Sequence, residues 1–358
     1  MQKKSPTEDP SYRRDDKKSG MTKNTKKRRD KSLGIILNHN KMNCSNSPKL
    51  ADTKRYAPMK ALALAALAGW LFAVPLVSNA QEIISLYTGP VPNSKPSDVQ
   101  ESGVDPGILK GITKPTLEYF KPAPDKASGA AVIIIPGGGY GVVVYQGEGI
   151  NIAKALAEKG VAAFILKYRL PSDAIMPDKK IGPLQDAQQA IKLVRDGAAK
   201  WGVDPAKVGV MGFSAGGHLA STAATHFEKA YIDNTSNTNL RPDFQILIYP
   251  VISMRDSLTH GGSHDNLLGK NPSRQDVDLF SNELQVRANT PPTYLTHAAD
   301  DKLVDVDNSI IYFEKLRHLN VPVEMHIYPK GDHGFIFRHP GWMEPLFAWM
   351  TINQWIKN

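Results

Sequence analysis

A serine between two glycines is the part of this sequence best suited to carry out chemistry. Gly212-Phe213-Ser214-Ala215-Gly216 has the spacing Gly-x-Ser-x-Gly. At a sharp turn from a strand into a helix, this spacing exposes the serine hydroxyl, and the glycines let neighbouring elements approach the turn closely. An apolar run at 207–211 precedes the pattern, and a segment rich in small residues at 214–225 follows it. We therefore predict a nucleophilic Ser214, the alternative being a purely structural glycine turn.

A base that activates Ser214 is predicted near the carboxyl end of the chain. A serine hydroxyl is a poor nucleophile until a base removes its proton, and that base needs an acid to orient it. His333 follows an apolar strand predicted at 323–328, and loops at the carboxyl ends of parallel strands are where such sheets build their sites. His218 lies four residues after the serine on one predicted helix, where packing beneath the turn is the simpler interpretation. The predicted base is therefore His333.

Two adjacent aspartates are candidates for the acid. Asp300 and Asp301 both follow a predicted strand that ends near His297. Because neighbouring side chains point in different directions, only one of the two can face His333. Residue type and position alone leave both candidates open.

The elements that must position these residues alternate along the chain. Strands that alternate with helices are typical of an α/β fold with a doubly wound, mostly parallel sheet and helices on both faces. The segment at 89–128 is rich in Pro, Gly and Ser and is predicted to be an extended arm with one strand at 116–120. The segment at 252–289 breaks the alternation and is predicted to be an insertion over the site. The remaining strands are predicted at 130–135, 161–168, 207–211, 244–249, 293–296 and 323–328, and the helices at 151–159, 184–201, 214–225, 306–319 and 342–355.

The first 80 residues differ in character from the rest. An apolar run at 61–77 follows a positively charged start and ends in Ser78-Asn79-Ala80. This pattern is typical of a secretory signal peptide cleaved near Ala80, the alternative being a membrane anchor. Since signal peptides begin at the initiating methionine, we expect the signal peptide to span 59–80 and residues 1–58 to be an upstream extension. The expected mature chain, 81–358, is then one secreted or periplasmic catalytic domain with no stable membrane anchor.

The positive charge of the chain also resides in these first residues. Residues 1–80 hold 17 lysines and arginines against 6 acidic residues, whereas the remainder holds 27 against 29. We therefore expect no nucleic-acid partner, the alternative being that the basic extension binds nucleic acid or membrane. The single cysteine, Cys44, lies in the same extension. The expected mature chain needs no disulfide and no thiolate metal site, and we expect neither a metal nor another cofactor.

Three segments, 167–171, 212–220 and 332–335, carry a resemblance to a known group of enzymes. The span 116–355 resembles the secreted esterase branch of the α/β-hydrolase fold, and within it the BD-FAE-like and acetyl-xylan-esterase-like carbohydrate esterases. His297-Ala298-Ala299-Asp300-Asp301-Lys302-Leu303-Val304 is similar to the acid loop of the prolyl oligopeptidase and esterase group. In that loop the acid falls four residues after the histidine, so the resemblance favours Asp301 over Asp300.

The three glycines before Tyr140 are similar to the His-Gly-Gly-Gly loop that provides part of the oxyanion hole in these enzymes. The resemblance implies the backbone N–H groups of Gly138, Gly139 and Ala215 as donors to a developing oxyanion. Pro136 stands where the family has its histidine. We expect Tyr140 to bind substrate by narrowing the acyl pocket, which would exclude long chains. The alternative is that its side chain packs beneath the loop.

The sequence as a whole predicts a serine esterase that needs no metal. We expect it to remove short acyl groups, acetyl foremost, from a polysaccharide, an oligosaccharide or another small ester, through an acyl-enzyme on Ser214. A peptidase of the prolyl oligopeptidase type is one alternative, although the expected mature chain is too short for a propeller and shows no blade-like repeat. A catalytically silent hydrolase fold used for binding is the other. The sequence does not fix the oligomeric state.

Overall fold

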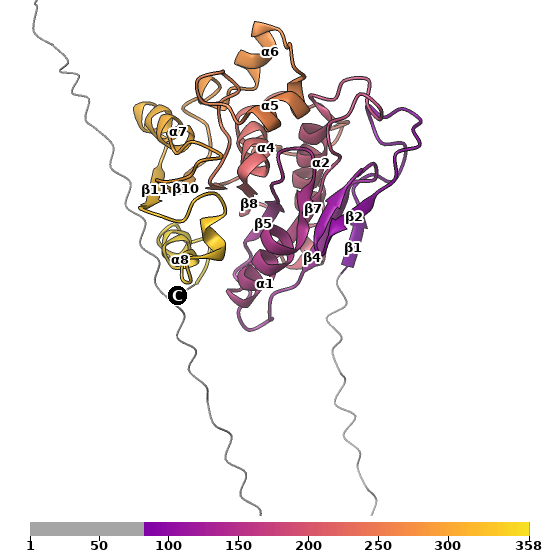
Figure 1. Ribbon diagram of the computed structural model, residues 1–358. Helices are drawn as coiled ribbons and strands as arrows, with labels where there is room; N and C mark the ends of the chain where they lie inside the picture. The colour runs from indigo at the N-terminus through magenta and orange to yellow at the C-terminus, as the bar shows by residue number, and fades with distance from the viewer. Residues whose placement is uncertain (1–81, 358) are drawn as a thin grey trace, which may run out of the picture. The chain divides into compact units, whose positions relative to one another are not determined.

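Eight strands form the central sheet of the computed structural model, which describes residues 82–357 (Figure 1). Along the sheet the strand order is β1-β4-β7-β5-β8-β9-β10-β11. The six strands from β7 to β11 in this order run parallel, and β1 and β4 add an antiparallel edge. The predicted doubly wound, mostly parallel sheet is therefore confirmed. The strands are β1 (Glu82–Ser85), β4 (Thr116–Phe120), β5 (Ala131–Ile135), β7 (Ala162–Lys167), β8 (Val208–Phe213), β9 (Gln245–Ile248), β10 (Thr293–Ala298) and β11 (Val323–Tyr328).

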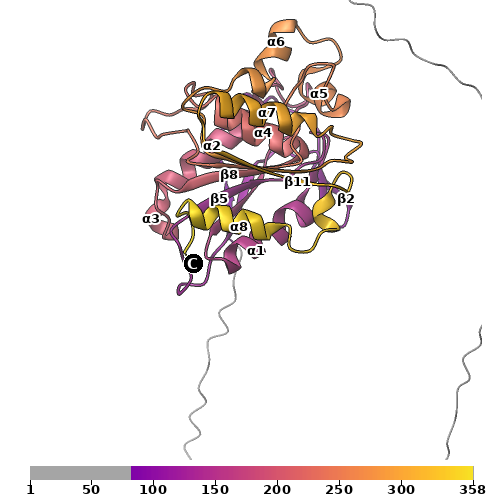
Figure 2. The same ribbon diagram turned by 90° about the vertical axis from the view of Figure 1, so that its left-hand side faces the viewer.

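Helices cover both faces of this sheet (Figure 2). Helices α2, α4 and α7 lie on one face, and α1 and α8 lie on the other. The bounds of these helices are α1 (Asn151–Glu158), α2 (Gly182–Asp196), α4 (Ser214–Thr225), α7 (Asp307–His318) and α8 (Met343–Ile352). The predicted extension at 1–58 and the predicted signal peptide at 59–80 lie outside the described residues.

The central strands are buried on both faces. Every residue of β5 and β8 is buried, and alternate side chains of β5 enter two different core clusters. Ile133 and Ile135 pack under the α2 and α4 layer, whereas Val132 and Ile134 pack with residues of α1 and α8. Continuous apolar runs are what such doubly covered parallel strands require, and this is why their positions could be predicted.

Two predicted elements differ in detail from the structure. The helix predicted at 184–201 is interrupted at Gly197 and continues as a separate short helix, α3 (Ala198–Trp201). A Cβ atom at Gly197 would lie 2.4 Å from the Trp201 ring, so the break lets this indole pack against the end of α2. The arm predicted at 89–128 also contains more structure than expected. Strands β2 (Ser102–Asp105) and β3 (Ile108–Lys110) pair there with β6 (Val143–Val144) in a second sheet.

The segment at 252–289 interrupts the alternation, as predicted. It contains α5 (Gly261–Leu268), α6 (Arg274–Leu279) and the 3₁₀ turn η2 (Asn282–Leu284). Its Asn266 side chain donates a hydrogen bond to the backbone oxygen of Gly139, with 2.8 Å between the atoms, so α5 contacts the glycine loop that follows β5. Within residues 82–357, no helix is both long and apolar enough to span a membrane.

Candidate active site

Ser214 lies at the turn between β8 and α4. Its φ angle is +50°, a strained value for a residue with a Cβ atom and typical of functional sites. The glycines on either side are required by close contacts. A Cβ atom at Gly212 would lie 2.2 Å from the Gly216 oxygen, and one at Gly216 would lie 2.1 Å from the Ile135 oxygen. The predicted order of strand, tight turn and helix is therefore observed.

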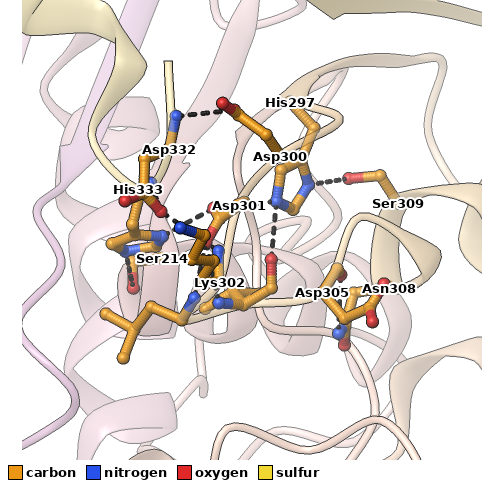
Figure 3. A network of polar contacts seen from close by, with 12 residues as sticks. Ser214, His297, Asp300, Asp301, Lys302, Asp305, Asn308, Ser309, Asp332 and His333 are labelled. Carbon is orange, nitrogen blue, oxygen red and sulfur yellow. Dashed lines mark hydrogen bonds and ion pairs between the residues drawn. The ribbon is translucent and has the colours of Figure 1, made fainter. Parts of the chain in front are cut away.

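His333 lies within hydrogen-bonding distance of the serine (Figure 3). Its Nε2 is 3.0 Å from Ser214 Oγ, and its Nδ1 is 2.8 Å from Asp301 Oδ2. The imidazole is carried on a turn after β11, in which Asp332 and Gly334 both have left-handed backbone angles, with φ of +53° and +72°. The three residues come from loops after β8, β10 and β11, and the structure brings them together in the order serine, histidine, aspartate.

Hydrogen bonds hold the Asp301 carboxylate on every side. Its Oδ1 accepts hydrogen bonds from the backbone N–H groups of Leu303 and Val304, both at 2.9 Å. Its Oδ2 lies 3.1 Å from His297 Nε2 as well as close to His333. Burial raises the pKa of Asp301, but the hydrogen bonds from the two histidines and the Val304 N–H, together with the charge of His333, outweigh it and hold this pKa well below its usual range. The side chain therefore stays ionised at neutral pH.

Asp300 points away from the histidine and has a different task. Its Oδ1 accepts a hydrogen bond from the backbone N–H of Asp332, with 2.8 Å between the atoms. This bond links the loop after β10 to the loop that carries His333 (Figure 3). The two adjacent aspartates therefore divide as their geometry requires, with Asp301 facing the imidazole and Asp300 joining the loops.

The glycine loop after β5 approaches the serine. A Cβ atom at Gly137 would lie 2.9 Å from the Cβ of Ser214. Gly138 and Gly139 have φ angles of +126° and +62°, which glycine adopts without strain. Among the described residues, the N–H groups of Gly138 and Gly139 have no protein acceptor, whereas the N–H of Gly137 donates to Glu148. Ala215 lies in the first turn of α4, where N–H groups lack intrahelical acceptors.

Tyr140 does not line an open pocket, which corrects the expectation that it narrows the acyl site. Its side chain is 1% exposed, and its hydroxyl lies 2.8 Å from His218 Nδ1. His218 Nε2 in turn lies 2.8 Å from the backbone oxygen of Phe280, so Nε2–H donates there and Nδ1 accepts from the phenol. The left-handed backbone at Tyr140, with φ of +60°, directs the ring into the core beneath the loop.

Sequence reasoning missed four residues around the triad. His297 donates to the carboxylate of Asp301, and Tyr249 packs its ring against His333. Glu148 is buried behind the glycine loop. His260 lies before α5, and its Cε1 would be 3.6 Å from a Cβ atom at Gly139. No local motif marks these positions; only the spacing of His297 before the acid was a usable signal.

The surroundings of His260 determine its protonation state and which ring nitrogen carries the proton. Its Nδ1 accepts a hydrogen bond from the backbone N–H of Ser263 at the start of α5. Burial lowers the pKa of His260 and the charge of His333 lowers it further, and together they outweigh the opposite effect of the Asp301 charge. This imidazole is therefore neutral at pH 7, with its proton on Nε2.

Within residues 82–357, no group of three or more His, Cys, Asp or Glu side chains is arranged to hold a metal ion.

The chemistry available to this arrangement is acyl transfer. A hydroxyl at a tight turn, an imidazole that can remove its proton, and an ionised carboxylate that orients the imidazole form a Ser–His–Asp arrangement. Two glycine N–H groups without a protein acceptor, on the loop that approaches the serine, can stabilise negative charge on an acyl oxygen. The fold and the site together define an α/β-hydrolase.

The family follows from comparison with known proteins. The BD-FAE family model matches residues 117–316, more than half of the chain, and the protein belongs to this family. It is 39% identical over 218 residues to an acetylxylan esterase of Xylanibacter ruminicola, covering 60% of this chain and 42% of that protein. It is 36% identical over 205 residues to endo-1,4-beta-xylanase B of Butyrivibrio fibrisolvens, covering 57% of this chain and 32% of that protein. The chain thus spans less than half the length of these two relatives.

A solved structure is similar over nearly its whole length. The acetyl ester-xyloside bifunctional hydrolase of Caldicellulosiruptor lactoaceticus matches with a TM-score of 0.66 and 34% identity, covering 77% of this chain and 97% of that one. An α/β hydrolase from a deep-sea metagenome library matches with a TM-score of 0.53 and 23% identity, which supports the fold alone. The match to the Caldicellulosiruptor lactoaceticus enzyme thus covers nearly all of that chain.

Proposed function

We propose that this protein is a serine esterase that removes acetyl groups from xylan-type polysaccharides or oligosaccharides. The hydrogen-bonded chain Ser214–His333–Asp301, with distances of 3.0 and 2.8 Å, carries the proposal for the reaction. The substrate class rests on the acetylated xylan and xyloside named for two of its relatives. The esterase activity named for these relatives supports ester hydrolysis over peptide hydrolysis.

In the first half of the proposed reaction, Ser214 Oγ attacks the acetyl carbonyl carbon while its proton moves to His333 Nε2. The carbonyl oxygen becomes an oxyanion, for which the N–H groups of Gly138, Gly139 and Ala215 are the proposed donors. Ionised Asp301 stabilises the imidazolium. When the tetrahedral intermediate collapses, the bond to the sugar oxygen breaks, that oxygen takes the proton from His333, and the acetyl group stays on Ser214.

The second half of the proposed reaction releases acetate. His333 removes a proton from a water molecule, and the water oxygen attacks the acetyl carbon of the acyl-enzyme. The new oxyanion occupies the same position as the first. Its collapse breaks the bond to Ser214 Oγ, which recovers its proton from His333, so the enzyme returns to its starting state.

Acetate release from acetylated xylan tests this function directly. We expect release to depend on Ser214, and we expect a fluorophosphonate probe to label that residue, as located by peptide mass. Parallel assays with p-nitrophenyl acetate, butyrate and octanoate would rank the acyl groups. Cleavage of peptide substrates without ester hydrolysis would instead support the peptidase alternative, and failure of the probe to react would support a silent fold.

We also propose that the protein is exported and that the mature chain begins at Gln81. The support is the sequence pattern of 59–80 alone. Expression from Met59 in a bacterial host, followed by amino-terminal sequencing of the exported protein, tests this. An exported chain that keeps residues 59–80, or a protein that is not exported, would contradict it.

A further inference from the structure

A buried carboxylate that the proposed reaction does not use lies directly behind the glycine loop. Glu148 is 5% exposed and belongs to the π-helical turn η1 (Tyr145–Ile150). Its Oε2 accepts a hydrogen bond from the Gly137 N–H at 2.6 Å, and its Oε1 accepts one from the Tyr249 hydroxyl at 2.9 Å. Both donors belong to loops that form the site.

Tyr249 links this carboxylate to the catalytic imidazole. It follows β9 and has a φ angle of +36°, a strained conformation for an aromatic residue, which persists where the surroundings hold it. Its ring lies 4.8 Å from the His333 ring, measured between centroids, at an interplanar angle of 60°. The same side chain therefore contacts the base with its ring and Glu148 with its hydroxyl.

The hydrogen bond to Gly137 decides which N–H groups of the glycine loop remain available to a substrate. Because Gly137 directs its N–H at Glu148, this group cannot also bind an oxyanion. The chain then turns left-handed at Gly138 and Gly139, whose N–H groups have no acceptor within residues 82–357. Glu148 thus fixes the start of the loop whose next two N–H groups are the proposed oxyanion donors.

A buried carboxylate is costly unless hydrogen bonds or an opposite charge compensate it. Burial raises the pKa of Glu148 above its ordinary value, and the Gly137 N–H, the Tyr249 hydroxyl and the charge of His333 offset part of this rise. In the proposed reaction His333 becomes positively charged in each transition state, which is when a negative charge nearby is most favourable. The titratable and charged groups that face Glu148 and His333 include Tyr168, Tyr249, His260 and Asp301, together with Asp332 and Arg338, which form hydrogen bonds with the His333 backbone.

We propose that Glu148, acting through Tyr249, is a positioning residue that holds the glycine loop and favours the imidazolium form of His333 during turnover. This inference rests on the proposed serine mechanism. Asp301 orients the imidazole from one side, and the Glu148–Tyr249 pair supports it from the side of the glycine loop. The enzyme then uses two carboxylates for one developing charge, only one of which touches the base.

Glu148→Gln is the variant that isolates the charge. Glutamine has the same shape and keeps an oxygen that accepts from the Gly137 N–H, but it has no negative charge. We expect kcat to fall roughly tenfold, well short of the about 10²–10³-fold loss when an oxyanion donor is removed. We expect KM for p-nitrophenyl acetate to stay within about twofold, because the proposed effect is confined to the transition state.

The pH profile gives a readout that a merely structural role would not move. Without the Glu148 charge, protonation of His333 is less favourable, so the base form persists to lower pH. The acid limb of the profile of kcat/KM should therefore shift to lower pH, by on the order of 0.5 unit, because the two side chains interact at longer range than a direct ion pair. Tyr249→Phe keeps the ring against His333 but removes the link, and should shift the limb in the same direction by less.

Glu283→Gln is the matched control. Glu283 is also buried, at 3% exposed, and its Oε1 accepts a hydrogen bond from the Ser253 hydroxyl. We expect this variant to keep the wild-type kcat and acid limb. Equal changes in the Glu283 and Glu148 variants would overturn the inference, because they would reflect the loss of any buried charge.

The inference would also be overturned by a Glu148→Gln protein that circular dichroism shows to be folded and that has the wild-type kcat and pH profile. If that variant does not fold, Tyr249→Phe decides: a shifted limb supports the inference, and an unshifted limb rejects it. Failure of the underlying mechanism would look different. In that case Ser214→Ala would keep its activity, or the wild-type protein would show no ester hydrolysis.

Discussion

Asp186 and Asp301 both have fully buried side chains, yet their partners differ in kind. Asp186 in α2 pairs with Arg169, whose Nη2 lies 2.8 Å from Asp186 Oδ1. Asp301 pairs with His333 at 2.8 Å and with His297 at 3.1 Å. An arginine is charged at every pH at which the protein is folded, whereas a histidine gains and loses its proton near neutral pH. The Asp186–Arg169 pair can therefore only stabilise the fold, whereas the Asp301–His333 pair can also take part in proton transfer.

The surroundings of the two pairs agree with this division. Arg169 also donates hydrogen bonds to the Pro92 backbone oxygen at 2.7 Å and to the Ser94 hydroxyl at 3.0 Å. It therefore ties the arm at 89–128 to α2. Asp301 is linked instead, through His333, to the hydroxyl of Ser214, which lies on a strained turn. The comparison predicts that damage to one pair reduces folding stability and that damage to the other reduces turnover.

The largest expected effect is on turnover at the end of the second network. Ser214→Ala should lower kcat by about 10⁴-fold or more, because every attack in the proposed mechanism passes through this hydroxyl. The melting temperature should change little, since the variant removes one atom at a turn that the surrounding glycines define. Steady-state assay with p-nitrophenyl acetate and a thermal melt check both statements. Near-normal turnover by the purified variant would remove Ser214 from the mechanism.

The next effect separates the two adjacent aspartates. Asp301→Asn should lower kcat by about 10⁴-fold, because the amide neither stabilises the imidazolium nor selects the required tautomer. Asp300→Asn is the matched control and should cost less than about tenfold, since an amide oxygen can still accept from the Asp332 N–H. A reversed ranking would assign the acid to Asp300.

Asp301→Asn should also change how the stability of the protein depends on pH. Because hydrogen bonds hold the native pKa of Asp301 below its usual value, the ionised group contributes stability above its unfolded pKa of about 3.9, and this contribution is lost as the pH falls toward the native value. The free energy of unfolding, measured with denaturant, should therefore fall less steeply from pH 6 to pH 3 in Asp301→Asn than in the wild type. Identical slopes would show that the carboxylate is not stabilised as its hydrogen bonds imply.

The first network should respond in the opposite way. Asp186→Asn leaves the buried guanidinium of Arg169 without its counter-ion and should lower the free energy of unfolding by about 3–5 kcal/mol. The fraction that stays folded should keep kcat within about threefold, because no atom of this pair contacts the triad. Urea unfolding and active-site titration with a fluorophosphonate measure the two quantities separately. A large loss of kcat per titrated site would show that the two networks are coupled.

The sequence predicted most of what is local. The turn at Ser214, the loop that carries His333 and the burial of β5 and β8 depend on neighbouring residues and regular spacing, so they could be located. The contacts of Glu148 could not, because its partner Tyr249 lies 101 positions further along the chain and only the completed sheet brings the two together. Strands β2 and β3 were missed for a related reason. They are short and half exposed or exposed, so they lack the apolar alternation that marks a strand.

The smallest expected effect concerns a third buried pair, in which a histidine has no catalytic task. Burial lowers the pKa of His218 to about 4, so its neutral Nδ1 accepts from the Tyr140 hydroxyl throughout the working range. Tyr140→Phe leaves that nitrogen without a donor and should lower the free energy of unfolding by about 1–2 kcal/mol. Since the phenol ring is packed inside the fold, the ratio of kcat/KM for butyryl and acetyl esters should not change.

Tyr312→Phe is the matched control, because the buried Tyr312 hydroxyl accepts a hydrogen bond from Gln245 at 3.1 Å. This variant should lower the free energy of unfolding by about as much. If Tyr140→Phe alone changed the acyl ratio by more than about threefold, the phenol would reach the acyl pocket after all. Because this threshold is smaller than the roughly tenfold minimum effect of a methylene in a hydrophobic pocket, the two variants must be measured side by side.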